Sequence, residues 1–164
     1  MFKDGSIFSK PFGNPYTLDI AGSKRKQPKA WGQWREQGGT LKVTWPNKKT
    51  AEWKTWFRCR AAAPGLRLAG KFQSADSFGG AVVANFNTIA FNREGQFSLT
   101  TLKGGNTAWL PVYSSSNRAG RYEFDGYTVR LEMNDGSREE FAFCLYPKDD
   151  EHFAIGSSHY VPLD

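Results

Sequence analysis

Apolar and polar residues alternate along much of the chain from Gly32 onward. In residues 41–45, Leu, Val and Trp alternate with Lys and Thr, and residues 53–60 repeat this pattern except at Trp56. Successive side chains of a β-strand point to opposite faces of the sheet. Each of these segments is therefore predicted to form a strand with one buried face and one face in water.

The same criterion indicates about ten short strands at intervals of roughly 8 to 12 residues. Turn sequences such as NREG, KGGN and MNDGS separate them, and Asp-Gly in the last of these supplies the positive φ that a tight hairpin needs. After an extended segment at residues 6–12, the expected strands lie at residues 41–45, 53–60, 66–72, 82–91, 96–102, 107–113, 120–124, 127–133, 139–146, 152–155 and 159–161.

Strands at this spacing, with almost no segment able to form a helix longer than two turns, predict an all-β fold, either a sandwich or an antiparallel barrel. A barrel is favoured because closure removes the exposed edges of a chain of hairpins. The 164 residues suffice for one domain with a substantial core. We therefore expect a single antiparallel β-barrel of about 8–10 strands over residues 31–164. An irregular N-terminal arm at residues 1–30 would pack on or beside it.

The chain contains an internal repeat at a constant offset of 88 positions. Gly32 and Gly38 in one segment correspond to Gly120 and Gly126 in the other. A single β-meander cannot bury its apolar face, so two copies closing on each other would form one core. Chance likeness is the other interpretation, since any two meanders share alternation and turn glycines. The copies extend approximately over residues 31–73 and 119–161.

The first copy opens with Gly32-Gln33-Trp34, which resembles the Gly-x-Trp opening of the lipocalins and the wider calycin group. The resemblance implies a calycin-like barrel that the chain enters at Gly32, with Trp34 plugging the closed end. The middle of the chain lacks the Thr-Asp-Tyr segment of this group, and no arginine follows Tyr160 to cover Trp34. The second copy also resembles a β-meander found in many uncharacterised bacterial proteins.

Charge is distributed unevenly along the sequence. The formal net charge is +6, but residues 1–75 contain 15 Lys or Arg against 4 Asp or Glu, whereas residues 76–164 contain 7 against 12. A basic half can attract nucleic acid, a carboxylate ligand or an acidic protein surface. The alternative is that the charge only keeps a strand-rich domain soluble. The candidate residues for binding an acidic protein or nucleic acid lie in the basic run GSKRKQPK and are Lys24, Arg25, Lys26 and Lys29.

Five of the six tryptophans fall between residues 31 and 56. Aromatic side chains can line a cup for a flat or apolar ligand, or they can fill the core of a small barrel. Arg58 and Arg60 would share a strand face with Trp56, where guanidinium groups beside an aromatic ring can bind carboxylate or phosphate. A solvated outer face is the alternative. The candidate ligand-binding residues are Trp45, Trp53, Trp56, Phe57, Arg58, Arg60 and Phe143.

The sequence offers little support for catalysis or for a metal site. His152 and His159 are the only histidines, and Ser158 beside His159 would point to the opposite face of a strand. Two histidines without a neighbouring Cys or carboxylate pattern do not form a zinc motif. We therefore expect no metal and no cofactor, although one histidine in a β-barrel can bind haem iron.

Cys59 and Cys144 each lie in a predicted strand and are either free thiols or one disulfide. The first residues lack the zones of a secretion signal, and no apolar run is long enough to span a membrane. These features leave the compartment open between a cytoplasmic protein and a mature or excised domain.

We therefore expect a non-enzymatic binding domain that holds a small, largely apolar or aromatic ligand in a barrel cup. The alternative is an interaction module whose basic N-terminal half docks an acidic protein or nucleic acid. A third hypothesis is a barrel cyclase or isomerase without a recognisable motif.

Overall fold

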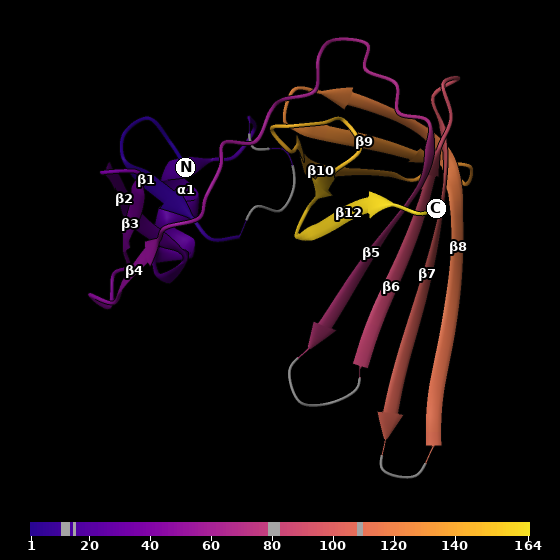
Figure 1. Cartoon of the computed structure of the whole chain (residues 1–164), viewed down its shortest axis with the longest axis horizontal. Coiled ribbons are helices and arrows are strands. Elements are labelled where there is room, and N and C mark those ends of the chain that lie inside the picture. The colour runs from indigo at the N-terminus through magenta and orange to yellow at the C-terminus, as the bar shows by residue number, and fades with distance from the viewer. Residues whose placement is uncertain (11–13, 15, 79–82, 108–109) are drawn as a thin grey trace.

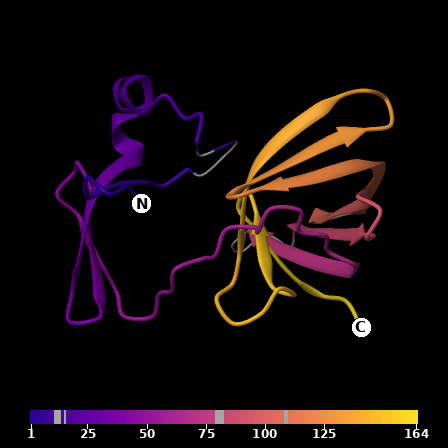
Figure 2. The ribbon, with the colours of Figure 1, turned by 90° about the horizontal axis from the view of Figure 1, so that it is seen from above.

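The computed structural model describes residues 1–10, 14, 16–78, 83–107 and 110–164. Its strands form two assemblies, a four-stranded sheet near the N-terminus and a closed barrel of eight antiparallel strands. The two lie side by side (Figure 1, Figure 2). The predicted all-β fold with an antiparallel barrel is confirmed.

The barrel is an up-and-down meander in which consecutive strands pair. β12 closes it by pairing with β5, where Val161 lies opposite Gln73. The meander therefore closes on itself without a terminal edge strand. Its strands are β5 (Gly70–Phe78), β6 (Val83–Phe91), β7 (Gln96–Thr107), β8 (Leu110–Asp125), β9 (Thr128–Met133), β10 (Arg138–Leu145), β11 (Phe153–Ile155) and β12 (Ser158–Pro162).

Strands β5 to β8 extend past the other four at one end of the barrel, which we call the barrel mouth (Figure 1). β8 covers 16 residues, whereas the sequence predicted separate strands at residues 107–113 and 120–124. The small polar residues 114–117 stay in the strand because they pair with residues 100–103 of β7. Residues 108–109 of the predicted strand lie outside the described part of the chain.

Phenylalanine and tyrosine side chains fill much of the barrel core. On β8, Tyr122 and Phe124 are buried, and the residues on either side of each are exposed or half-buried. The ring centroid of Phe124 lies 4.3 Å from that of Phe143, and Phe91 packs edge-on against Tyr122. Rings in such contacts bury large apolar areas. Of the described tryptophans, none belongs to this core.

The N-terminal sheet has its own small core. Its buried residues are Ile7, Leu41 and Val43, and the tryptophans packed against them are Trp34, Trp45 and Trp56. A unit of this size can enclose few side chains, so large indole rings supply much of its apolar area. This packing accounts for three of the five tryptophans that lie between residues 31 and 56. The strands are β1 (Ser6–Phe8), β2 (Trp31–Gln37), β3 (Thr40–Thr44) and β4 (Thr50–Trp53).

A short helix, α1 (Ile20–Lys26), and a single helical turn, η1 (Pro28–Ala30), connect β1 to β2. Asp19 caps α1, because its carboxylate accepts a hydrogen bond from the Gly22 amide at 2.9 Å. The Trp31 Nε1 donates to the Ser23 Oγ at 3.0 Å and ties α1 to β2. The segment predicted to be an irregular arm therefore contains a strand and a helix. The sequence has a weak intrinsic preference for helix, and the Asp19 cap and the packing of α1 against β2 stabilise it.

The barrel includes fewer residues than the sequence pattern predicts. Residues 31–53 pair with β1 and with one another, and barrel pairing begins at Gly70. Residues 31–53 of the first copy consequently pack in the core of the N-terminal sheet, whereas the second copy packs in the barrel core together with Phe72 at the end of the first. The single core that we predicted for the two copies is therefore wrong. The physical reason is that β1 covers the edge of the first meander, while β5 to β7 complete the sheet of the second.

Local geometry nevertheless preserves the repeat. β3 begins at Thr40 and β9 at Thr128, which are 88 residues apart. Gly38 and Gly126 precede these strands with φ of 57° and 58°. The two glycines therefore adopt the same left-handed conformation at the same place in two meanders.

The following turn repeats as well. The Lys48 amide donates to the Trp45 carbonyl, and the Gly136 amide donates to the Met133 carbonyl, both at 2.9 Å. Lys48 and Gly136 both have positive φ, 63° and 84°. One type of meander thus occurs twice in the chain, once in each sheet system.

A linker, residues 54–69, connects the N-terminal unit (residues 1–53) to the barrel. It contacts the barrel through two isolated bridges, Arg60 to Leu145 and Ala62 to Gly126. The strand predicted at residues 53–60 is therefore wrong beyond its first residue, since β4 ends at Trp53.

Candidate ligand-binding site

The barrel mouth contains a pocket of about 210 Å³, which we call the barrel pocket. Its inner part is apolar. Ile89 of β6 lies opposite Leu99 of β7, and both point into the barrel. Leu131, Phe141, Ile155 and Tyr160 complete this apolar lining from β9 to β12.

The outer part of the barrel pocket is polar. Asn87 and Thr101 face each other across β6 and β7, two residues outward from Ile89 and Leu99. Arg118 of β8 lies opposite Leu99. Because directly opposite residues share a sheet face, Arg118 is directed into the barrel mouth.

Arg118 forms an ion pair across the barrel mouth. Its Nη1 lies 2.9 Å from both carboxylate oxygens of Glu139, a residue that faces Leu131 on β9. Both side chains are more than one third exposed, so the pair contributes little to stability. Among the described contacts Glu139 engages only Nη1, and a guanidinium has five N–H donors. Arg118 is therefore suited to bind an anionic group at the mouth.

A two-residue turn between β11 and β12 forms one wall of the barrel pocket. Ile155 pairs with Ser158, and Gly156 between them has φ of 60°. A positive φ at the first central residue is typical of a type II′ hairpin turn, in which glycine is strongly preferred. The backbone preference of Gly156 thus sets the position of Ser157 at the pocket.

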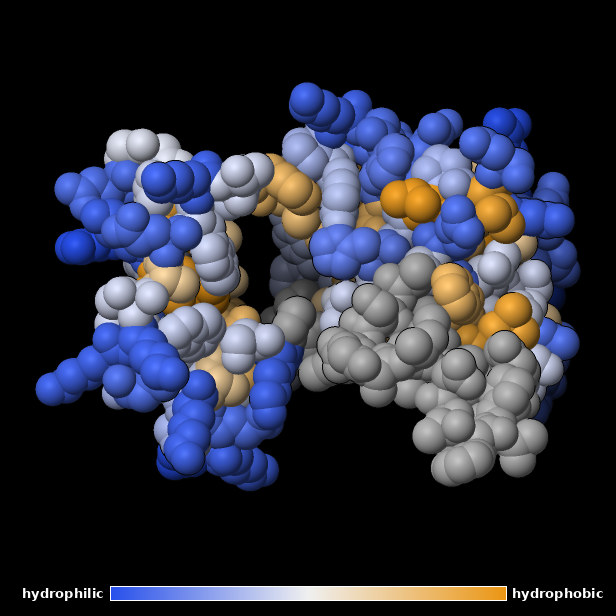
Figure 3. All heavy atoms as spheres, turned by 60° about the horizontal axis from the view of Figure 1, so that its bottom comes forward, coloured by the Kyte–Doolittle hydropathy of each residue, from blue (hydrophilic) through white to orange (hydrophobic). Residues whose placement is uncertain are grey.

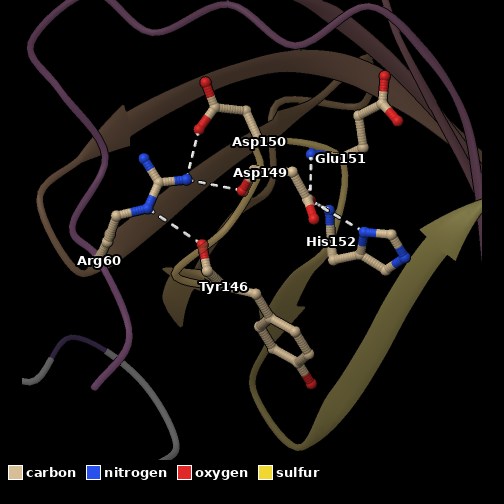
Figure 4. Close-up of polar contacts among 6 residues, drawn as sticks. All are labelled: Arg60, Tyr146, Asp149, Asp150, Glu151 and His152. Atoms are coloured by element: carbon tan, nitrogen blue, oxygen red, sulfur yellow. Dashed lines mark hydrogen bonds and ion pairs between the residues drawn. The ribbon is translucent and has the colours of Figure 1, made fainter. Parts of the chain in front are cut away.

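A second polar cluster lies where the linker meets the barrel (Figure 4). The Arg60 Nε donates to the Tyr146 carbonyl at 3.0 Å. Its Nη2 donates to the Asp149 carbonyl at 2.6 Å and to the Asp150 carboxylate at 2.7 Å. Since these acceptors belong to the segment between β10 and β11, Arg60 holds the linker against that segment.

His152 belongs to the same cluster (Figure 4). Asp149 Oδ1 accepts a hydrogen bond from the His152 amide at 2.8 Å and lies 2.9 Å from its Nδ1. The hydrogen bond from the His152 side chain, followed by that from its amide, lowers the pKa of Asp149. His159 contacts the Tyr146 hydroxyl instead. In the described part of the chain, no group of three His, Cys, Asp or Glu side chains is placed to hold a metal ion.

The structure does not bring the predicted ligand-binding residues together. Trp45 packs on the core of the N-terminal sheet, and Trp53 is exposed on β4. The Trp56 Nε1 donates to the Gly39 carbonyl at 2.9 Å. Phe143 is buried in the barrel core. The expected cup that combines these tryptophans with Phe143 is therefore not formed, because Trp45, Trp53 and Trp56 lie in or beside the N-terminal sheet and Phe143 lies in the barrel core.

The remaining three predicted residues lie in the linker. Phe57 packs against Tyr146, with ring centroids 4.9 Å apart. Arg58 pairs with Glu36 at 3.3 Å and lies over the Trp56 ring. These residues, like Arg60, connect the linker to its neighbours and do not line the barrel pocket.

The predicted partner-binding residues lie on α1 and η1. Lys24 pairs with Asp4 at 3.5 Å and lies over the Trp31 ring, whereas Arg25, Lys26 and Lys29 are exposed. A second pocket, of about 290 Å³, lies beside this helix. This second pocket is larger than the barrel pocket, but a helix of only seven residues bounds it on one side. Residues from seven strands frame the barrel pocket.

Sequence reasoning missed the residues of the barrel pocket. One signal was available: the inward faces of β6 and β7 change from apolar to polar at matching positions, Ile89 to Asn87 and Leu99 to Thr101. A polar change at the same level of two paired strands indicates the edge of a filled core. Arg118 carried no such signal, because residues 114–119 were predicted to form a loop between two strands.

Comparison of the chain with models of known families, with curated proteins and with solved structures finds no match. The described helices are too short to span a lipid bilayer.

Proposed function

We propose that this protein is a binding module whose barrel holds a small amphipathic ligand. The apolar part of the ligand would lie against Ile89, Leu99 and Leu131, with an acidic group at Arg118. The observation that carries this proposal is the barrel pocket, with an apolar interior and an arginine at its mouth. Its volume of about 210 Å³ is below the roughly 300–1,000 Å³ of sites for drug-sized molecules, which favours a small ligand.

The expected affinity is moderate. Burial contributes about 0.8 kcal/mol per methylene group, and a charge-assisted hydrogen bond contributes about 1.5–3 kcal/mol. Association and ordering oppose these gains. A short-chain carboxylate would therefore bind with a Kd between about 1 mM and 1 μM.

We also propose that the barrel is calycin-like, with Tyr122 in the place that the resemblance assigned to Trp34. At the end of the barrel away from the mouth, the carbonyl oxygens of Leu68 and Asn92 lie 3.0 and 2.8 Å from the Tyr122 hydroxyl and share its one proton. The Arg67 guanidinium lies 5.6 Å from the centre of its ring. A covered aromatic residue at the closed end supports this proposal, whereas Trp34 lies in the N-terminal sheet.

Calorimetric titration with hexanoate, phenylacetate and the uncharged analogue hexanol tests the ligand proposal. We expect Arg118→Gln to weaken carboxylate binding about tenfold, which corresponds to about 1.4 kcal/mol, and to leave hexanol binding unchanged. The matched control is Arg138→Gln, because Arg138 forms a similar ion pair with Glu132 at 3.1 Å away from the pocket. Absence of binding by all three compounds, or equal losses in both variants, would contradict the proposal. Tryptophan fluorescence is a poor substitute, since the five tryptophans between residues 31 and 56 lie outside the barrel.

A second candidate function is the binding of an anionic partner by the N-terminal unit. Residues 1–53 contain 10 Lys or Arg against 4 Asp or Glu. Hydrophilic residues cover much of this unit on the face shown in Figure 3. The exposed side chains of Arg25, Lys26 and Lys29 add positive charge at the end of α1 and on η1.

A salt titration of binding to oligothymidine and to a poly-glutamate peptide tests this second candidate. We expect the affinity to fall steeply with salt, as counterion release requires. Neutralising Arg25, Lys26 and Lys29 together should weaken binding more than neutralising the control set Lys48, Lys49 and Lys54. Equal effects of the two sets would indicate only nonspecific attraction and would contradict a site on α1.

A further inference from the structure

The linker and β10 bring the only two cysteines of the chain to one place. Arg60 and Leu145 exchange both backbone hydrogen bonds, each at 2.9 Å. Cys59 precedes Arg60, and Cys144 precedes Leu145. Because successive side chains alternate along paired extended backbone, Cys59 next to the Arg60–Leu145 bridge and Cys144 of β10 both lie on the face opposite Arg60 and Leu145.

This face is the covered outer surface of the barrel. Thr128 of β9 pairs with Ala142 of β10, two residues before Cys144, and alternates with the core residue Val129. Thr128 is nevertheless completely buried. The Tyr127 hydroxyl donates to the Cys59 carbonyl at 3.2 Å. The linker therefore packs on this surface and holds Cys59 beside β10.

The two free thiols influence each other directly. A hydrogen bond with Cys144 lowers the pKa of Cys59 to about 7. The same interaction, together with burial, raises the pKa of Cys144. The pair therefore shares one proton after the first ionisation, with the thiolate on Cys59. A thiolate is the reactive form of cysteine.

We propose that Cys59 and Cys144 are a reversible disulfide switch that reacts with small disulfides and fixes the linker to the barrel. The reaction begins when the Cys59 thiolate attacks one sulfur of a small disulfide such as oxidised glutathione. This step forms a mixed disulfide and releases one glutathione thiolate.

The second step closes the switch. Cys144 loses its proton to the solvent and attacks the Cys59 sulfur, and the second glutathione leaves as a thiolate. The two protein thiols are oxidised, and one small disulfide is reduced to two thiols. Excess reduced glutathione reverses both steps.

The position of Cys59 makes the bond geometrically accessible. Diagonal neighbours across two strands have Cα atoms roughly 7–8 Å apart, whereas a disulfide requires about 4.4–6.8 Å. Cys59 lies outside any strand, so the linker can move the remaining distance while β10 stays in the barrel. Closure of the bond would join the linker covalently to β10.

The test measures disulfide formation in the full chain incubated with oxidised glutathione, by mass spectrometry after alkylation of the remaining thiols. We expect a monomer about 2 Da lighter than the reduced chain, without alkylation and without retained glutathione. After trypsin, the dipeptide Cys59-Arg60 should be joined to the peptide 139–148. The rate of the reaction should rise to half its maximum near pH 7, below the value of about 8.5 for an ordinary thiol.

Serine variants provide the control. Cys144→Ser should retain one glutathione on Cys59, because no second thiol displaces it, and reduced glutathione should remove it. A stable glutathione adduct on the unmodified chain, a dimer linked between chains, or two thiols that stay reduced would each overturn the proposal. The experiment on the unmodified chain decides the question even if a serine variant fails to fold.

Discussion

At the scale of single residues, Lys48 shows how two copies of one turn diverge. Among the described residues it alone combines a side chain with a positive φ, 63°. The equivalent residue of the second copy is Gly136, with φ of 84°. A left-handed conformation costs an L residue about 1–2 kcal/mol, and glycine avoids most of this cost. The first copy therefore carries local strain that the second copy lacks.

We expect Lys48→Gly to raise the free energy of unfolding by about 0.5–1 kcal/mol, because the relief of strain exceeds the entropy cost of glycine. Urea unfolding followed by tryptophan fluorescence measures this effect, since five tryptophans lie in or next to the N-terminal sheet. The matched control is Lys49→Gly at the next position, where φ is not positive and the substitution should destabilise. A loss of stability in both variants would show that the turn tolerates lysine without strain.

At the scale of elements, close approach of two strands explains why a glycine opens each meander. A Cβ added to Gly120 would lie 1.9 Å from the Glu132 carbonyl oxygen of the neighbouring strand. At the equivalent Gly32 it would lie 2.8 Å from the Thr44 carbonyl oxygen. The glycine of each Gly-x-aromatic sequence is thus explained by contact between strand backbones. The aromatic residues of the two sequences pack on different cores, Trp34 on that of the N-terminal sheet and Tyr122 in that of the barrel.

We expect Gly120→Ala to destabilise the barrel by about 3 kcal/mol or more, because the backbone of β8 or β9 must shift. The control is Gly39→Ala, which has φ of 76° and no atom within 4 Å of the added Cβ, and which should cost about 1–2 kcal/mol. Thermal unfolding followed by circular dichroism compares the two variants. Equal losses would mean that β8 and β9 move apart at little cost and that their close approach does not require glycine at position 120.

At the scale of the whole molecule, the linker determines how the two sheet systems are connected. Arg60 donates three hydrogen bonds to the segment between β10 and β11 (Figure 4). The aromatic contact of Phe57 with Tyr146 adds to this attachment. The N-terminal unit is therefore attached through contacts of the linker as well as through the continuous chain.

We expect Arg60→Gln to release the linker and to accelerate trypsin cleavage after Lys54 about fivefold, because loss of about 1 kcal/mol increases local opening by that factor. Arg58→Gln is the control, since Arg58 contacts Glu36 and Trp56 within the N-terminal unit and its adjoining segment. The rate of cleavage after Lys54, compared between the two variants, distinguishes attachment of the linker to the barrel by Arg60 from the contacts that Arg58 makes with the N-terminal unit. Similar rates in both variants would contradict attachment by Arg60.

Strand pairing explains which parts of the candidate site could not be predicted. Residues 53–60 were placed in the barrel because their apolar and polar residues alternate, yet that pattern is equally compatible with any sheet that offers a core. Arg118 was missed because its segment of small polar residues has no strand pattern, and only its pairing with β7 directs it into the barrel mouth. Pairing partners are distant in sequence and leave little local signal.

The sequence by itself determined the all-β class, most strand positions, the turns NREG and MNDGS and the repeat, since these depend on side-chain alternation and on residues that accept positive φ. The turn predicted at KGGN is wrong, because residues 103–106 pair with β8 inside the continuous strand β7. Gly38 and Gly126 show this directly, with the same φ in two different sheets. Tertiary structure alone decided that the tryptophans belong to a separate sheet, that seven barrel strands frame one pocket, and that Cys59 lies beside Cys144. These features require contacts between distant segments, and their stability depends on the area that each sheet buries.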